Sequence, residues 1–108
     1  MAASEPASDR PTARPTVQID NDVVRVTEWA FAPGATTGPH RHEYDYVVVP
    51  MATGRLRILA GDDENIAELV TGRAYYRPAG VEHEVISAND GDFTFVEVEL
   101  KDRGLGPA

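Results

Sequence analysis

The stretch GPHRHEYDYVVVP, residues 38–50, holds two of the chain's three histidines one residue apart, directly ahead of an apolar run. On an extended backbone, residues two apart point to the same side and lie about 6.6 Å apart along the strand. His40 and His42 can therefore converge on one ion while Arg41 projects the other way. By itself, a His-x-His pair more often marks ordinary polar residues at a strand entrance than a metal site.

The third histidine changes this balance. His83 lies in RPAGVEHEV, residues 77–85, where it follows a Pro/Gly turn and begins another apolar segment. Every histidine of the chain thus stands at a strand entrance, and in a barrel such entrances gather at one mouth. Neutral imidazole is a good ligand for first-row divalent metals. We therefore predict a three-histidine metal site of His40, His42 and His83. The alternative for His83 is an ordinary strand-edge residue hydrogen-bonded to a neighbour.

The pattern around these motifs is that of an all-β protein. Short apolar and β-branched segments alternate with turns rich in Gly, Pro, Asn and Asp. Only residues 63–70 could instead form a short helical turn. A chain this small with many short strands favours a barrel or jelly roll, which limits exposed sheet edges. We expect strands near residues 17–19, 23–31, 44–50, 55–60, 65–70, 74–77, 83–88 and 93–100.

Composition narrows the function classes. The chain has 108 residues, and its 10 basic and 18 acidic side chains give a net charge of −8, which argues against nucleic acid and anionic membranes as partners. There is no cysteine, so any metal must be held by nitrogen and oxygen ligands. No apolar run approaches the ~20 residues of a membrane span. Because the N-terminus also lacks a signal-peptide stretch, we expect a cytoplasmic protein.

The termini differ from the rest of the chain. Residues 1–15 are rich in Ala, Ser, Pro and charge, which predicts a flexible N-terminal arm. Residues 104–108 have the same character and predict a flexible C-terminal tail. A single domain is expected over residues 16–103.

The two histidine motifs resemble those of the cupins. Residues 34–54 carry the first motif in Gly34-x5-His40-x-His42 and its closing Gly54. The second is Gly72-x5-Pro78-x-Gly80-x2-His83, with Ser87 where the family usually has Asn. More narrowly, HRHEYDYVVVP, YYRPAGVEHEV and FVEVEL are similar to segments of the small single-domain cupins associated with β-alanine degradation. The resemblance implies a double-stranded β-helix, a small jelly-roll barrel, with a divalent ion inside and commonly a homodimer.

One residue departs from the family pattern. Four residues past His42, where the family has a Glu ligand, this chain has Tyr46. Alternation from His42 turns Tyr46 inward and Asp45 outward, so the expectation is three histidines and no acid. Three neutral imidazoles leave a divalent ion its full charge, which favours a small anionic ligand. Similar three-histidine sites occur in Fe(II) thiol dioxygenases and diketone-cleaving cupins. Fe²⁺ is therefore favoured, with Zn²⁺, Ni²⁺ and Mn²⁺ open.

Several neighbours are candidates for a role beside the metal. Tyr46 is the candidate catalytic residue, because a phenol at the barrel mouth can hydrogen-bond a bound anion; the alternative is an aromatic that only fills the barrel. A solvated or salt-bridged Glu97 is favoured over a carboxylate near the metal. Trp29 is expected between the sheets or at a dimer interface, together with Phe31. Three arginines could hold a carboxylate, with solvated surface positions favoured for each: Arg57, Arg73 and Arg77.

These observations support two main function classes. The first is a metal-dependent oxidoreductase, a non-haem Fe(II)-type dioxygenase acting on a small anionic metabolite. The second is a non-catalytic or regulatory cupin that binds a small molecule and uses the metal as a structural element. A metal-assisted isomerase or decarboxylase stands between them. All histidines are used as ligands, so acid–base work would fall to other groups.

Overall fold

The computed structural model describes residues 10–101, which contain nine β-strands and no helix. Within this range no segment therefore qualifies as a membrane-spanning helix. The all-β prediction is confirmed, and residues 63–69 form a strand rather than a helical turn. The strands are β1 (Arg14–Asp20), β2 (Val24–Phe31), β3 (His40–Arg41), β4 (Asp45–Pro50), β5 (Gly54–Ala60), β6 (Asp63–Leu69), β7 (Tyr75–Arg77), β8 (Glu82–Ser87) and β9 (Phe93–Leu100).

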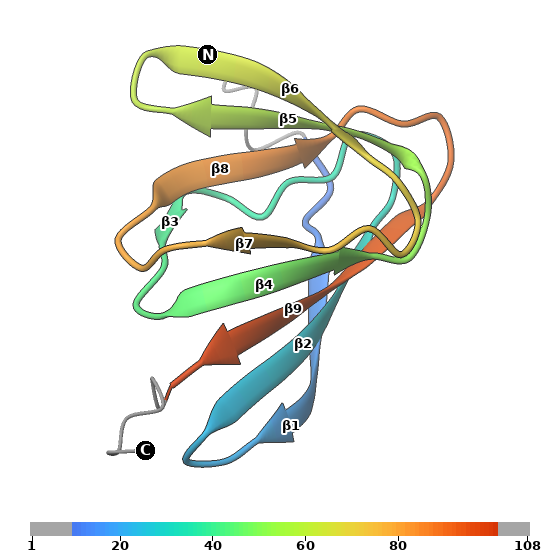
Figure 1. The fold of residues 1–108 in the computed structure, drawn as a ribbon. Coiled ribbons are helices and arrows are strands. Elements are labelled where there is room, and N and C mark those ends of the chain that lie inside the picture. The colour runs from blue at the N-terminus through green and yellow to red at the C-terminus, as the bar shows by residue number, and fades with distance from the viewer. Residues whose placement is uncertain (1–9, 102–108) are drawn as a thin grey trace.

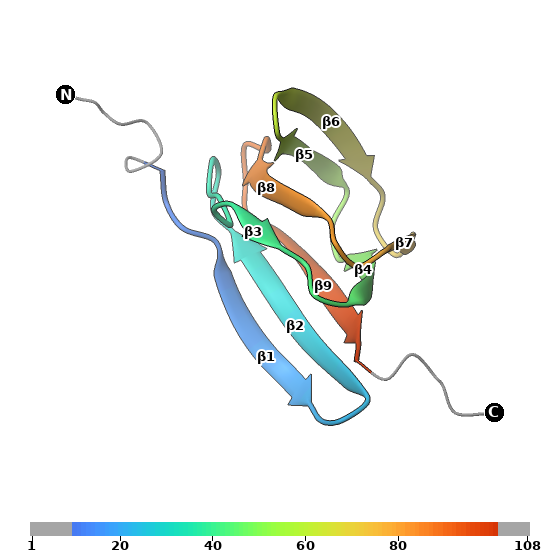
Figure 2. The ribbon, with the colours of Figure 1, turned by 90° about the vertical axis from the view of Figure 1, so that its left-hand side faces the viewer.

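The strands form two sheets that face each other (Figure 1). One sheet has five strands in the order β1-β2-β9-β4-β7, and the other has four in the order β3-β8-β5-β6. Each neighbouring pair of strands is antiparallel. Figure 2 shows the two layers from the side, with β1 and β2 at one edge and β5 and β6 at the other. This is the jelly-roll barrel that the sequence predicted.

The stretch 38–50 is divided between the two sheets. β3 pairs with β8 in the four-stranded sheet, whereas β4 lies between β9 and β7 in the five-stranded sheet. The chain crosses from one layer to the other at residues 42–44. Backbone hydrogen bonds hold the crossing, from the His42 N–H to the Val81 carbonyl (2.9 Å) and from the Gly80 N–H to the His42 carbonyl (2.8 Å). The two cupin-like motifs therefore meet through their backbones.

The core lies between the sheets and follows strand alternation. On β4, Tyr46 and Val48 point inward, as predicted, with exposed fractions of 2% and 3%. Phe31 is a core residue and Trp29 packs against the core, so these two aromatics lie between the sheets. Of the two positions expected for these aromatics, the structure shows the one between the sheets.

The folded body begins earlier than residue 16. Ala13 is buried, and its N–H donates to the Thr36 carbonyl at 2.9 Å. β1 begins at Arg14. Residues 14 and 15, which composition assigned to the N-terminal arm, thus belong to the sheet. Of the rest of the predicted arm, residues 10–13 are described and residues 1–9 lie outside the described residues, as does the predicted tail.

The outer face of the five-stranded sheet carries an apolar row that crosses every strand. Successive pairing partners are Ile19 with Val26, Val26 with Val98, Val98 with Val47, and Val47 with Tyr76. The two end members are about half exposed, at 47% for Ile19 and 54% for Tyr76. We call these five residues the outer row.

Candidate metal centre

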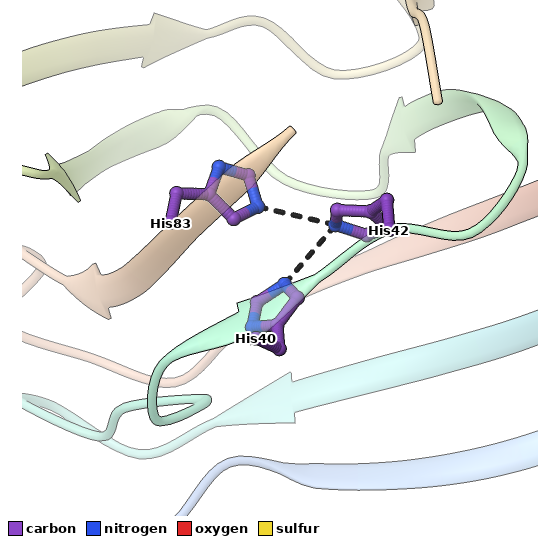
Figure 3. A group of neighbouring side chains, drawn as sticks. All are labelled: His40, His42 and His83. Atoms are coloured by element: carbon purple, nitrogen blue, oxygen red, sulfur yellow. Dashed lines mark hydrogen bonds between the residues drawn. The ribbon is translucent and has the colours of Figure 1, made fainter. Parts of the chain in front are cut away.

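The three predicted ligands come together at one point between the sheets (Figure 3). The Nε2 atom of His42 lies 3.0 Å from Nε2 of His40 and 3.1 Å from Nε2 of His83. One ring nitrogen from each of the three residues lies within 4.8 Å of the others. The sequence prediction that these side chains converge is therefore confirmed as geometry.

These nitrogen positions fit a shared divalent ion. Metal–nitrogen distances are about 2.0–2.1 Å, so two ligands at right angles around one ion lie about 3 Å apart. The Nε2 separations match that value. Direct hydrogen bonds among the rings explain the cluster less well, because His42 Nε2 faces two neighbouring nitrogens and a neutral imidazole nitrogen either donates or accepts. One cation would satisfy all three lone pairs.

His40 is oriented by its other ring nitrogen. Its Nδ1 lies 3.0 Å from the Gly38 carbonyl and 3.3 Å from Thr37 Oγ1. A carbonyl can only accept, so Nδ1 carries the proton and Nε2 keeps the lone pair for a metal. Thr37 Oγ1 in turn donates to the Gly38 carbonyl and accepts the Val85 N–H at 3.1 Å. This threonine therefore joins the ligand segment to β8.

His42 is held by stacking rather than by a strand ladder. Its ring lies over the Tyr46 ring with centroids 3.8 Å apart and planes inclined by 19°. Burial, followed by the nearby His40, lowers the His42 pKa to about 4. His83 is the direct register partner of His40 across β3 and β8. Burial and the two other histidines likewise lower its pKa to about 4. Both imidazoles are thus neutral at physiological pH, as metal binding requires.

Two acidic side chains stand beside His42. Glu97 and Glu99 are each 8% exposed, and each places a carboxylate oxygen within 4.8 Å of a His42 ring nitrogen. Arg25 holds Glu99 through two contacts of 2.6 and 3.2 Å. Glu97 instead accepts a hydrogen bond from Trp29, and burial followed by Glu99 raises its pKa to about 7. The expectation of a solvated or salt-bridged Glu97 was wrong.

The signal for these carboxylates was present in the sequence. On β9, Phe93 and Phe95 alternate in phase with the two glutamates, so one inward face carries all four residues. Judged from sequence alone, glutamates that follow phenylalanines on one face of a strand indicate either a change of phase or an inter-subunit contact. The structure shows an unbroken strand instead, because the inner face of β9 passes from the apolar core to the polar histidine cluster.

Asp45 is a positioning residue that sequence alternation alone could not identify. It points outward at the start of β4, where its carboxylate accepts hydrogen bonds from the Tyr76 hydroxyl (2.6 Å) and the Ala79 N–H (2.8 Å). The Ala79 contact ties β4 to the turn that carries Gly80. That turn binds the His42 backbone and leads into His83.

The histidine cluster borders three hollows, two of which also contain Glu97. An inner cavity of about 60 Å³ is lined by apolar side chains together with His40, His83, Tyr46 and Arg77. An open groove of about 500 Å³ runs along the inner side of β1 and β2 and reaches His40 and His42. Glu97 borders both. A ligand could therefore approach a metal ion from two sides.

The fold and the ligand geometry agree with comparisons to known proteins. A family model described as a cupin domain matches residues 27–99. This chain belongs to the cupin family. The cupin is 56% identical over 94 residues to the "Beta-alanine degradation protein BauB" of Pseudomonas aeruginosa, which covers 87% of this chain and 99% of that protein.

Solved structures give the same fold. A cupin domain from Bordetella pertussis has 54% sequence identity and a TM-score of 0.85, covering 87% of this chain and 98% of that one. A Klebsiella pneumoniae protein described as having a double-stranded β-helix domain has a TM-score of 0.70 over 97% of this chain and 95% of its own. Its 15% identity makes that likeness one of fold alone.

The three arginine candidates have different surroundings in this cupin. Arg57 pairs with Glu64 at 2.9 Å on the outer side of β5 and β6. Arg73 lies in the exposed segment between β6 and β7. Arg77 alone of the three borders the inner cavity. Arg73 and Arg77 are exposed and Arg57 is partly exposed, so the preference for a surface position holds, and Arg77 borders the cavity from the surface.

Proposed function

We propose that this cupin binds a divalent metal ion through His40, His42 and His83 and acts on a small anionic metabolite as a metal-dependent oxidoreductase of the dioxygenase type. The single observation that carries the proposal is the convergence of the three histidines, in which His42 Nε2 lies about 3 Å from the Nε2 atoms of both His40 and His83. The donor set is neutral, and Fe²⁺ is the favoured ion, with Zn²⁺, Ni²⁺ and Mn²⁺ as alternatives.

A bound divalent ion would supply Lewis acidity and, if it is iron, redox chemistry. The chain's own residues determine what it would attract. Because burial keeps His42 and His83 neutral, they cancel none of the ion's charge, and an anionic ligand is favoured. The apolar wall of the inner cavity would exclude water and strengthen that attraction.

Tyr46 has two roles in this proposal. Its ring supports His42 by stacking, which fixes the direction of the His42 lone pair. Its hydroxyl borders the same interior as the cavity, and burial, followed by the charge of Glu97, raises its pKa. The phenol therefore stays protonated at neutral pH and can donate a hydrogen bond to an anion in the cavity.

The name of the Pseudomonas relative suggests a substrate class. That protein is named for β-alanine degradation, and it shares more than half of its residues with this chain. We extend this to three-carbon carboxylates related to β-alanine as ligands of this cupin. An inner cavity of about 60 Å³ suits a ligand of that size, because about 15 Å³ of this space holds one water.

A binding role is the second candidate, and one observation favours it. All three histidines of the chain belong to the cluster, and there is no cysteine. Neither a free imidazole base nor a thiol nucleophile remains for chemistry beside the metal. A regulatory or carrier cupin with a structural metal needs neither, and an isomerase or decarboxylase would rely on the metal alone.

Elemental analysis of the purified native protein tests the metal site. We expect about one equivalent of a divalent transition metal per chain, and loss of that metal in His40→Ala. Met51→Ala, an exposed position away from the cluster, serves as the control and should keep it. If no divalent metal co-purifies, and added metal raises the melting temperature of the wild type and His40→Ala equally, the metal site is refuted.

Oxygen uptake separates the function classes. The Fe²⁺-loaded protein is supplied with β-alanine, 3-hydroxypropionate and 3-mercaptopropionate in turn, and oxygen consumption is followed beside product analysis. Uptake matched to loss of one compound supports the oxidoreductase. Turnover without oxygen supports the isomerase or decarboxylase. Binding of a compound without turnover supports the binding protein.

We also propose a homodimer formed through the outer row. The five members, Ile19, Val26, Val47, Tyr76 and Val98, cross the whole sheet without a charged side chain between them. A copy related by a two-fold axis can lay its own row against this one, since an isologous interface is self-complementary. Covering the row would remove apolar surface that the other sheet of the same chain does not reach.

A further inference from the structure

The strongest unexplained side chain at the centre is Arg77, the last residue of β7. It pairs in register with Tyr46 on β4, so the two side chains lie on the same, inner side of the sheet. Its neighbour Tyr76 points outward. Arg77 is exposed at the rim, yet it borders the inner cavity together with Tyr46, His83 and Glu97.

Arg77 has no ion pair within residues 10–101, a state that it shares with Arg10, Arg14, Arg55 and Arg73, but it alone of these five borders the inner cavity. Within residues 10–101, Arg25, Arg41, Arg57 and Lys101 each form an ion pair with a carboxylate. No ion pair or side-chain hydrogen bond involves Arg77 within that range. A guanidinium has five N–H donors arranged to match a carboxylate, so all of this capacity is available.

Tyr75 orients this unpaired guanidinium. The Arg77 Cζ atom lies 5.4 Å from the centre of the Tyr75 ring, within the range of a cation–π contact. Such a contact occupies the face of the guanidinium and leaves its N–H edges free.

We propose that Arg77 is the carboxylate-binding residue of the inner cavity. Its guanidinium receives the carboxylate of a short ligand whose other end points to the histidine cluster. The apolar wall formed by Val48, Leu56 and Phe95 accommodates the carbon chain between the two polar ends. This inference rests on the proposed function, since it names the residue that would hold the anion at that same site.

Binding measurements on the Zn²⁺-loaded protein test the inference without turnover. The probes are propionate and its neutral analogue propionamide, titrated with ligand-detected NMR. We expect Arg77→Gln to weaken propionate binding at least about tenfold, because a hydrogen bond to a charged group contributes about 1.5–3 kcal/mol. Propionamide should bind the wild type and Arg77→Gln equally. Arg73→Gln removes the same charge four residues away and should bind propionate as the wild type does.

Two further measurements separate this inference from the metal site. If Arg77→Gln retains zinc and binds propionate as tightly as the wild type, the inference is wrong while the metal site stands. If the wild type binds no zinc, the metal site fails, and the same titration on the metal-free protein then decides the inference. Arg77→Lys keeps the positive charge but loses the planar guanidinium that can donate two parallel hydrogen bonds to a carboxylate. Its affinity for propionate should therefore lie between those of Arg77→Gln and the wild type. If Arg77→Lys binds propionate as tightly as the wild type, a bidentate contact between the guanidinium and the carboxylate is contradicted.

Discussion

His40 and His83 lie directly opposite each other across the β3–β8 ladder, although they are 43 residues apart in the chain. Their rings meet at a centroid distance of 4.7 Å. Pairing in an antiparallel ladder is a backbone property, so any residue that secures β3 against β8 also secures the spacing of these two ligands.

Thr37→Val should weaken metal binding. The substitution removes the hydroxyl near His40 Nδ1 and leaves the Val85 N–H without its side-chain acceptor. We expect about tenfold lower metal affinity, typical of losing a group that orients a ligand, and about 1 kcal/mol lower stability. Competition with a chelator and chemical denaturation measure the two effects. Thr37→Ser keeps the hydroxyl and should behave as the wild type; equal losses in both variants would contradict this role.

Gly80→Ala should reduce both stability and metal affinity. Gly80 has a φ of 95°, where a side chain is strained, and its N–H donates to the His42 carbonyl. We expect a loss of about 1–2 kcal/mol in the free energy of unfolding. Gly91→Ala is the matched control, because Gly91 has no positive φ and an added Cβ meets nothing within 4 Å. A Gly80→Ala protein as stable as Gly91→Ala would show that this turn can rearrange freely.

Tyr46→Phe should keep the metal but lose activity. The phenylalanine ring retains the stacking on His42, so metal content and melting temperature should change little. Removal of the hydroxyl takes away one hydrogen bond to a bound anion, which corresponds to about tenfold or more in ligand affinity or turnover. Metal content is measured beside propionate binding and oxygen uptake. Unchanged binding and turnover would assign Tyr46 a packing role only.

Glu97→Gln should alter the pH dependence of stability in the metal-free protein. The Glu97 pKa rises from 4.5 in the unfolded chain to about 7 in the folded one, so the folded chain binds more protons between these values. This group therefore lowers stability as pH rises through that window. Glutamine resembles the protonated acid. Relative to the wild type, Glu97→Gln should gain up to about 3 kcal/mol between pH 4 and pH 8.

The histidines change the pH dependence of stability in the direction opposite to that of Glu97. His42 and His83 have pKa values lowered from 6.5 to about 4, so the unfolded chain binds more protons between those values and stability rises with pH. The wild type and Glu97→Gln share this histidine contribution, so it cancels when the free energy of unfolding of one is subtracted from that of the other. Thermal melts of the wild type and Glu97→Gln from pH 4 to pH 8 measure this difference in stability. A difference that stays constant with pH would show that Glu97 titrates normally.

Val98→Glu should prevent dimer formation. Val98 is the central member of the outer row, and a charge there could not be buried against a second copy without a large cost. Light scattering after size exclusion should give twice the chain mass for the wild type and the chain mass for the variant. Ile66→Glu places the same charge on an exposed apolar position of β6 and should stay dimeric. A monomeric wild type would contradict the assembly.

Local sequence determined much of this protein. Alternation on β4 was sufficient to turn Tyr46 and Val48 inward, because a strand buried on one side has only one acceptable phase. The three histidines were identifiable from their spacing beside Gly and Pro turns. Cysteine absence restricted the metal ligands to nitrogen and oxygen, and the acidic charge argued against nucleic acid.

Tertiary structure decided what spacing could not. The stretch 38–50 looks like one strand entrance, yet it crosses between two sheets, because β3 finds its partner in β8 and β4 finds its own in β9. That crossing, rather than side-chain alternation, brings His42 to the other two histidines. The closeness of Glu97 to His42 and the position of Arg77 at the inner cavity likewise depend on strands distant in sequence. Pairing between distant segments is set by the packing of the whole barrel, which no local pattern contains.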